Sequence, residues 1–307
     1  MDLQEWLHSL LPRLEGLRPW EALCTDGRRP GRHDAPRRQG ASHEFVGHRE
    51  YAPGDDMRRL DWKALGRSDR LLLKRFQDET SRPCEIVLDV GAGMNFRSDK
   101  TVLSKFEAAK RTAAVLGYIL FQSRDRFRLT VFDGIEKREI VPFDSSPAHW
   151  KRFLDRLEEC PTAPPRRVAE RDGRDETGPG FRGFFPAPRY TTFVLIGDLM
   201  FAEPEEVLRL PAMLRTRENR LVIFQLLDPA ELEFPYAKMT AFLDMERPGR
   251  SIQVDAGRIK TAFCEEMRRF LRQIDAECKS RGIPVLRLRT DEPLDEPLVR
   301  FLSRATF

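Results

Sequence analysis

The chain has 307 residues, 40% hydrophobic and 33% charged, and its 53 basic and 49 acidic residues leave a net charge of +4. This length fits one large domain, or a principal domain with a smaller companion. The longest apolar stretch, residues 113–121, is far shorter than the roughly 20 residues of a membrane helix. The N-terminus also lacks the basic start and apolar run of a signal peptide. The sequence therefore predicts a cytoplasmic protein without membrane insertion.

The small basic surplus also bears on possible partners. Five arginines lie within residues 28–38 beside a single acid. A nucleic-acid-binding protein usually has a larger and more clustered basic excess, so nucleic acid is disfavoured as a partner. The five cysteines include no CxxC pair, which predicts reduced thiols rather than a disulfide framework or a structural zinc site.

Residues 1–82 form an N-terminal segment that we expect to pack on the main domain. An amphipathic helix begins near Asp2 and should end before Pro12, because proline interrupts the hydrogen bonding of a helix. The remaining elements predicted in this segment are a strand at 44–50, a short helix ending at Leu65 and a strand at 71–76.

Residues 83–307 alternate between strand and helix patterns. Strands are predicted at 84–89, 127–132, 137–141, 192–197, 221–227 and 283–288, with a hairpin around 240–255. Helices are predicted at 106–120, 147–159, from 203, at 259–278 and from 295. A long polar loop is inserted at 161–189.

This alternation predicts an α/β fold with a doubly wound, mostly parallel sheet, because crossover helices cover both faces of such a sheet. The Asp133-Gly134 turn makes the strand at 137–141 an antiparallel edge strand. The N-terminal segment is an extension of this domain.

Ligands of such sheets bind outside the carboxyl ends of the strands, where the strand order reverses. Four predicted strands end in, or run into, an aspartate: Asp89, Asp133, Asp198 and Asp228. The hairpin turn explains Asp133, and an Asp-Pro turn explains Asp228. Asp89 and Asp198 are therefore the candidate site residues.

The segment after the first of these strands permits two interpretations. One is a methyltransferase-like enzyme that uses S-adenosylmethionine, in which Asp89, Gly91 and Gly93 would form a loop resembling DxGxGxG. Glycines in such a loop let the backbone approach the cofactor. Here Asn95 replaces the third glycine, and the next strand ends near Asp133, about forty residues on instead of roughly twenty.

The other interpretation is a resemblance to the von Willebrand factor A domain, whose metal-ion-dependent adhesion site has the form DxSxS with a further aspartate after the fourth strand. Asp89 and Asp198 match the two acids, whereas Gly91 and Gly93 replace the serine ligands. Mg²⁺ prefers oxygen ligands, so the loss of both hydroxyls predicts a degenerate site that binds Mg²⁺ weakly or not at all, and no cofactor.

The longest resemblance lies upstream, in the run FVGHREYAPGDDMRRLDWK that begins at Phe45. It resembles the signature RxYxPGDDxRxIDW of the bacterial family called domain of unknown function 58 (DUF58). The matching residues are Arg49, Tyr51, Pro53, Gly54, Asp55, Asp56, Arg58, Asp61 and Trp62. In that family the signature precedes a von Willebrand factor A-like domain, and the Asp89 loop follows here at the same interval.

Two roles for the signature stay open. Its charges could form an ion-pair network that locks the segment to the sheet, or Tyr51, Trp62 and the arginines could anchor a protein partner. The resemblance implies association with MoxR-type AAA+ ATPases, for which such proteins are thought to act as adaptors or substrates. The sequence has no P-loop, HExxH, GxSxG or CxxC motif. We therefore expect a non-enzymatic adaptor without catalytic residues, with the methyltransferase-like enzyme as the alternative.

Overall fold

The computed structural model describes residues 2–15, 44–50, 61, 71–77, 83–134, 137–162, 190–200, 219–247 and 249–304. The chain divides into two compact units, one formed by Met1–Gly27 with Arg82–Phe307 and one by Arg28–Ser81. The smaller unit contains an antiparallel pair of strands, β1 (Glu44–Glu50) and β2 (Leu72–Gln77). Both strands were predicted, although the predicted range of β2, residues 71–76, begins one residue before the observed strand. The predicted helices ending at Leu65 and starting at 203 lie outside the described residues, as does most of the loop at 161–189.

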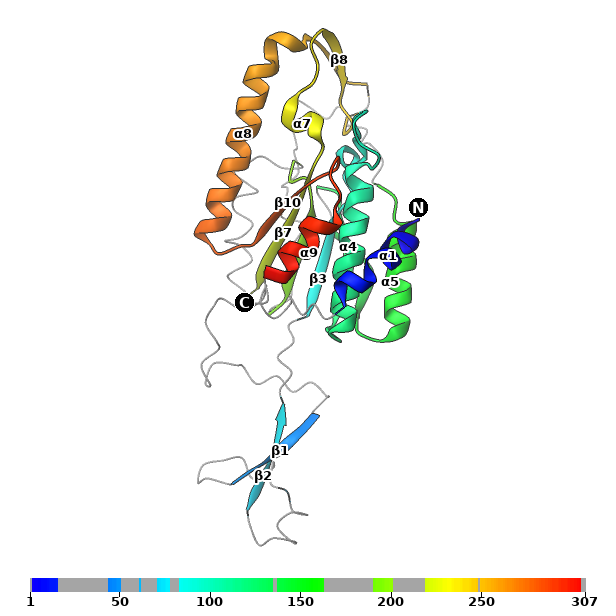
Figure 1. Cartoon of the computed structure of the whole chain (residues 1–307), viewed down its shortest axis with the longest axis vertical. Coiled ribbons are helices and arrows are strands. Elements are labelled where there is room, and N and C mark those ends of the chain that lie inside the picture. Colours follow the sequence, from blue (N-terminus) through cyan, green and yellow to red (C-terminus); the bar gives the residue numbers. More distant parts are fainter. Residues whose placement is uncertain are drawn as a thin grey trace, which may run out of the picture. The chain divides into compact units, whose positions relative to one another are not determined.

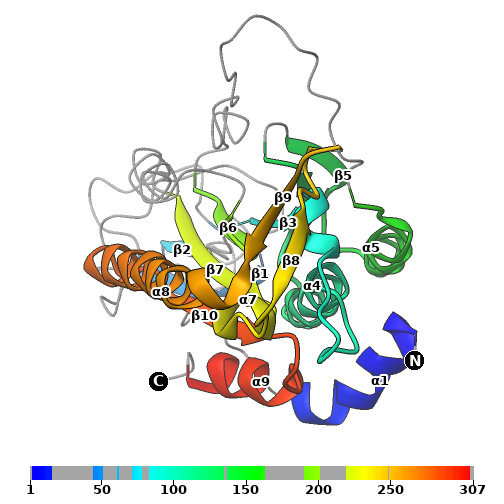
Figure 2. The same ribbon diagram turned by 90° about the horizontal axis from the view of Figure 1, so that it is seen from above.

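The larger unit is built on a six-stranded sheet with the order β10-β7-β6-β3-β4-β5 (Figures 1 and 2). Its strands are β3 (Cys84–Asp89), β4 (Phe127–Phe132), β5 (Lys137–Asp144), β6 (Thr192–Gly197), β7 (Arg220–Leu227) and β10 (Val285–Arg289). All neighbouring pairs are parallel except β4 and β5. The predicted doubly wound sheet with one antiparallel edge strand is therefore confirmed.

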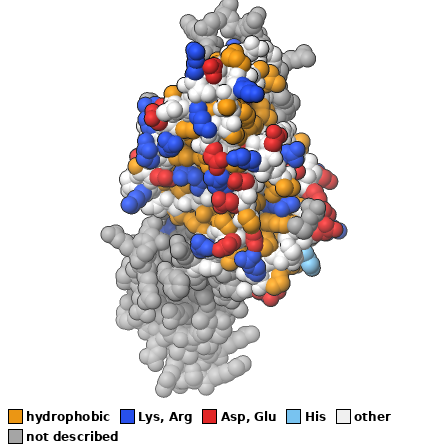
Figure 3. Space-filling model, turned by 45° about the horizontal axis from the view of Figure 1, so that its top comes forward, with side chains coloured by type: hydrophobic (Ala, Val, Ile, Leu, Met, Phe, Trp, Pro, Cys, Tyr) orange, Lys and Arg blue, Asp and Glu red, His pale blue; other side chains and the backbone are white. Residues whose placement is uncertain are grey.

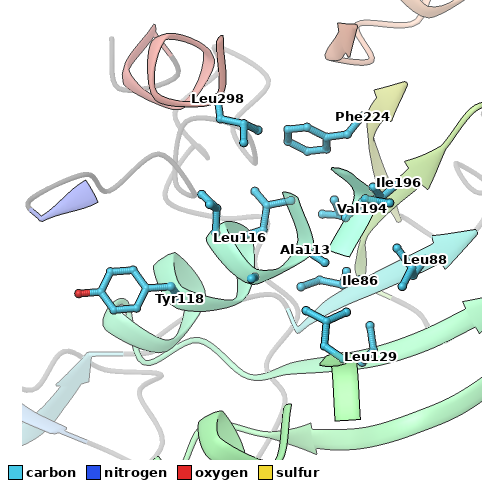
Figure 4. Close-up of a cluster of buried hydrophobic side chains, with 14 of the residues drawn as sticks. Ile86, Leu88, Ala113, Leu116, Tyr118, Leu129, Val194, Ile196, Phe224 and Leu298 are labelled. Atoms are coloured by element: carbon cyan, nitrogen blue, oxygen red, sulfur yellow. The ribbon is translucent and has the colours of Figure 1, made fainter. Parts of the chain in front are cut away.

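Helices cover both faces of this sheet, as Figure 2 shows from above. The helices are α1 (Leu3–Leu14), α4 (Lys105–Gln122), α5 (Pro147–Glu159), α7 (Pro229–Glu233), α8 (Ala256–Ser280) and α9 (Asp295–Arg304). Successive residues of the central strand β3 point to opposite faces. Ile86 and Leu88 join the core cluster under α4 (Figure 4), whereas Val87 packs in the cluster that includes Ile274 of α8. Burial on both sides explains why β3 is an uninterrupted apolar run rather than an alternating one.

The first helix differs from its prediction at its C-terminal end. α1 continues through Pro12 to Leu14, although the proline removes one hydrogen bond of the helix, because the buried Leu14 extends the apolar face. α1 also belongs to the larger unit, where Trp6 and Leu10 join the main core. The division into a segment 1–82 and a domain 83–307 stays a prediction.

Two elements near the carboxyl ends of the strands position the site. α7 is a short helix at a position where the sequence predicts an Asp-Pro turn. It leads into an antiparallel hairpin of β8 (Met239–Leu243) and β9 (Ser251–Asp255), close to the hairpin predicted at 240–255. Among the described residues, no helix is both long enough and apolar enough to cross a membrane.

The packing of α4 against α5 yields a test of the fold. A Cβ atom at Gly117 of α4 would lie 2.5 Å from Cε1 of Phe153, which is fully buried in α5. Alanine normally stabilises a helix interior by about 1 kcal/mol relative to glycine. Here we expect Gly117→Ala to lower the free energy of unfolding by about 1–3 kcal/mol, as overpacking does. Chemical denaturation would measure the change.

A double-mutant cycle with Phe153→Leu provides the control for this prediction. The smaller side chain makes room for the added methyl group, so Gly117→Ala should be less destabilising in the Phe153→Leu background than in the wild type. Equal effects in both backgrounds would contradict the steric explanation.

Candidate functional site

A pocket of about 240 Å³ lies at the carboxyl ends of β3 and β6. These strands are neighbours in the sheet, but the chain continues from β3 to β4 and from β6 to β7, in opposite directions. The pocket is therefore at the topological switch point, where ligands of such sheets bind. Its lining includes both predicted site residues, Asp89 and Asp198, and three charged residues that the sequence analysis missed: Lys105, Glu231 and Glu246.

Lys105 is the central residue of the pocket. Its Nζ atom lies 2.6 Å from Oδ2 of Asp198 and 2.5 Å from Oε1 of Glu231. The lysine side chain is only 2% exposed. Burial by itself would lower the pKa of Lys105, but Asp198 and Glu231 outweigh this effect and raise the pKa above its ordinary value. The site therefore contains a buried ammonium group that is paired with two carboxylates.

Local sequence explains how Lys105 reaches this position. Ser104 and Glu107 form a capping box that starts α4, so Lys105 is the first residue of the helix. A positive charge is unfavourable at the N-terminus of a helix, which carries a partial positive charge itself. The two carboxylates offset this repulsion, which makes a lysine possible at a position that normally favours an acid.

Both carboxylates are held in place by backbone amides. The other oxygen of Asp198, Oδ1, accepts a hydrogen bond of 2.8 Å from the amide of Met200. Oε2 of Glu231 accepts one of 2.9 Å from the amide of Asp228, within the capping box that starts α7. Each acid therefore has one oxygen fixed by the backbone and the other directed at Lys105.

Asp89 is the second predicted acid, and it is 1% exposed. Its Oδ1 atom accepts a hydrogen bond of 2.8 Å from the amide of Gly91. Burial, followed by the charge of Asp198, raises the pKa of Asp89 well above its ordinary value. The absence of a side chain at Gly197 is required here, since a Cβ atom there would lie 2.6 Å from that of Asp89.

The residues present do not fit the metal site of the von Willebrand factor A type. Gly91 and Gly93 supply no hydroxyl ligands, and the space between Asp198 and Glu231 is taken by an ammonium group. In the described part of the chain, no group of three or more His, Cys, Asp or Glu side chains is arranged to hold a metal ion. The geometry therefore supports an internal ion pair in place of metal coordination.

The other two strand-end aspartates lie outside the lining of the pocket. Asp133 precedes the β4–β5 turn, as the sequence predicted. Asp228 does more than start a turn, because it caps α7 and its Oδ2 atom accepts a hydrogen bond of 2.9 Å from the amide of Ser98. Asp228 thereby ties the loop that precedes α4 to the end of β7.

The DUF58-like signature is largely outside the described residues. Arg49 lies in β1, and Asp61 is partly buried and has an interaction partner. The other signature residues, Tyr51, Pro53, Gly54, Asp55, Asp56, Arg58 and Trp62, fall where the structure is not described. Their role, as a structural lock or as a binding surface, stays a prediction.

The raised pKa of Asp89 predicts how stability depends on pH. A carboxyl group whose pKa is higher in the folded than in the unfolded protein makes stability fall as the pH rises above the ordinary Asp value of about 4. Asp89→Asn removes this titration while keeping an oxygen for the amide of Gly91. We expect the variant to exceed the wild type in free energy of unfolding by about 1 kcal/mol at neutral pH, and to show a flatter pH profile.

Denaturation across a series of pH values would check this, with Asp99→Asn at an exposed position as the matched control. A neutral-pH loss of stability in Asp89→Asn that is absent from Asp99→Asn would show that the carboxylate of Asp89 stabilises the fold in its charged form.

Known proteins give three informative comparisons. An uncharacterised protein of Mycobacterium tuberculosis (strain H37Rv) and one of Mycobacterium bovis are each 23% identical over 265 residues, covering 83% of this chain and 77% of their own. The VWA domain of SpRpn10 is similar in structure with a TM-score of 0.38 and 12% identity, over 71% of this chain and 93% of that domain. The profile of the family described as "Protein of unknown function DUF58" matches residues 47–272. That match includes the signature, Asp89, Lys105 and Glu231, and this protein belongs to the DUF58 family.

Proposed function

We propose that this protein is a non-enzymatic adaptor that binds a protein partner through the carboxyl-end face of its sheet. We define this face as the β8–β9 hairpin together with the loops that follow β3 and β6. The partner we propose is an AAA+ ATPase of the MoxR type. The ATPase is suggested by the family resemblance, and the choice of surface comes from the geometry described below.

The chemistry of the pocket supports binding rather than catalysis. None of the described residues that line it is a Ser, Thr, Cys, His or Tyr, so they offer no hydroxyl, thiol or imidazole nucleophile. The lysine, which could act as a base if it were neutral, is held in its charged form by Asp198 and Glu231. These groups are arranged to hold loops together.

The observation that carries the proposal is the set of apolar side chains exposed on this face. The exposed fraction is 75% for Leu243 and 68% for Met239, both in β8 of the hairpin, and 84% for Val102 in the loop before α4. Met239 and Leu243 project from the same side of β8, because side chains alternate along a strand. Figure 3 shows hydrophobic side chains reaching the surface among acidic and basic ones. Exposed apolar surface rimmed by charges is typical of protein interaction sites.

The hairpin is also joined to the pocket. Met245 and Glu246, in the connection between β8 and β9, line the pocket, and the amide of Gly93 donates a hydrogen bond of 3.3 Å to Oε1 of Glu246. The exposed apolar residues therefore lie at the end of the sheet where the loops are fixed by buried ion pairs. A rigid apolar surface loses little conformational entropy when it binds a partner.

The proposal is tested by measuring the affinity of the purified protein for the MoxR-type ATPase of its own host. We expect Leu243→Asp and Met239→Asp each to weaken binding by about tenfold or more, because a charge placed at the centre of an apolar contact opposes its desolvation. Ala276→Asp, at an exposed position of α8, adds the same charge on another surface and should bind like the wild type. Circular dichroism of each variant establishes that it is folded.

Two other outcomes would indicate a different binding surface or a different function. Undiminished binding by both hairpin variants, with loss on changing Tyr51 and Trp62 to alanine, would place the contact in the signature. Absence of any ATPase binding, together with heat of binding when S-adenosylmethionine is titrated into the protein, would favour the methyltransferase-like alternative.

A further inference from the structure

We propose that Lys105 is a built-in replacement for a divalent cation, so that the cluster at the carboxyl end of the sheet is a cation site whose occupant belongs to the chain itself. The inference concerns the site's own chemistry and does not depend on the adaptor function. It has a concrete consequence: removal of the ammonium group should uncover a site that accepts a divalent metal ion.

The arrangement of the two carboxylates is that of preorganised ligands. In metal sites, hydrogen bonds from surrounding groups orient the ligands before the ion arrives. Asp198 and Glu231 have this support, since one oxygen of each is held by the amide of Met200 or of Asp228. Their remaining oxygens converge on one point, which the Nζ atom of Lys105 occupies at 2.6 and 2.5 Å.

The charges require a cation at this point. Asp198 is 5% exposed as a residue, and the side chain of Glu231 is 15% exposed. Two carboxylates that share one buried position repel each other strongly, because the surrounding dielectric is low. Asp89 adds a third carboxyl group nearby, whose raised pKa reflects burial and the charge of Asp198. A lysine ammonium or a metal ion could each relieve this repulsion.

The space around the ammonium also suits a small hydrated ion. Lys105 is the part of the chain that fills the region between Asp198, Glu231 and Phe96, whose ring centroid is 5.9 Å from Nζ. Mg²⁺ and Mn²⁺ are often bound by one or two carboxylates with water completing the coordination shell. Truncation of the lysine would leave both carboxylates and room for such water.

A lysine in place of a metal ion changes how the carboxyl-end face can bind a protein partner. A metal ion in an open site keeps a coordination position for a group of the partner. The side chain of Lys105 is 2% exposed, with its ammonium committed to two internal carboxylates. Recognition at this face therefore needs neither a divalent ion nor a coordinating carboxylate from the partner.

The test compares Lys105→Ala with Lys105→Met. Both remove the charge, but methionine keeps most of the side-chain volume, whereas alanine leaves a cavity that can admit a hydrated ion. Both variants should melt at a lower temperature than the wild type. Millimolar Mn²⁺ should raise the melting temperature of Lys105→Ala by about 5 °C or more, as ligand binding at a hundredfold excess over Kd does for a domain of this size. Mn²⁺ should leave Lys105→Met and the wild type unchanged.

A further variant identifies the ligands. Adding Glu231→Gln to Lys105→Ala removes one carboxylate while keeping its shape, and should weaken Mn²⁺ binding by about tenfold or more, as measured by electron paramagnetic resonance of the free ion. Ethylammonium, which resembles the end of the missing side chain, should also raise the melting temperature of Lys105→Ala.

The inference fails if Mn²⁺ stabilises neither variant, if it stabilises Lys105→Met as much as Lys105→Ala, or if the wild type binds Mn²⁺ at the same affinity. Should Lys105→Ala not fold alone, it is refolded with Mn²⁺ and, separately, with ethylammonium. Failure to recover folded protein with either would show that no external cation can replace the lysine, and would equally overturn the proposal.

Discussion

The buried contact of Lys105 with Asp198 and Glu231 is the interaction on which the carboxyl-end face depends. It joins the start of α4, the loop after β6 and the short helix α7, and in the described part of the chain no β-ladder connects these three segments. A buried ion pair is weak support for overall stability, because desolvation of the charges offsets their attraction. Loss of one partner has a different effect, because it leaves a buried charge without a counter-ion and destabilises the fold by about 3–5 kcal/mol. The contact therefore makes the arrangement of these loops strongly preferred over alternatives in which any one of them moves away.

Asp228 has a parallel role a short distance along the chain. It is fully buried, caps α7 through the amide of Ala230 and binds the amide of Ser98. The helix that presents Glu231 to Lys105 is thus itself fixed to the loop that leads to Lys105. Two carboxylates from the ends of different strands, Asp198 and Asp228, hold neighbouring parts of the same face.

The architecture was largely predictable because its signals are local. Strand β3 and helix α5 have the predicted ends, since a strand buried on both faces is a continuous apolar run, and Pro147 follows a serine cap. The helix α1 was misjudged at Pro12, where the packing of Leu14 outweighs the loss of a hydrogen bond. In these cases the pattern and the tertiary structure agree except at an element's end.

The site was only half predictable, because its central contacts are long-range. Lys105 is 93 residues from Asp198 and 126 from Glu231 in sequence. A pattern within a short stretch of sequence does not indicate that residues so far apart form an ion pair. Two local signs were nevertheless present. Asp228 and Glu231 have the spacing of a capping box, which identifies α7. A lysine at the first position of a helix opposes the helix dipole, which indicates that carboxylates lie nearby.

The two glycines that replace the expected serines also have a physical explanation. A Cβ atom at Gly91 would lie 3.2 Å from Oε1 of Glu246, and one at Gly93 would lie 3.6 Å from it. The distance at Gly91 is tighter than ordinary packing, whereas the distance at Gly93 is an ordinary van der Waals contact. The absence of a side chain at Gly91 therefore helps the hairpin to come close enough for the hydrogen bond from Gly93 to Glu246. Because Lys105 already pairs with Asp198 and Glu231, a hydroxyl group at Gly91 would have no metal ion to bind and would only crowd the carboxylate of Glu246.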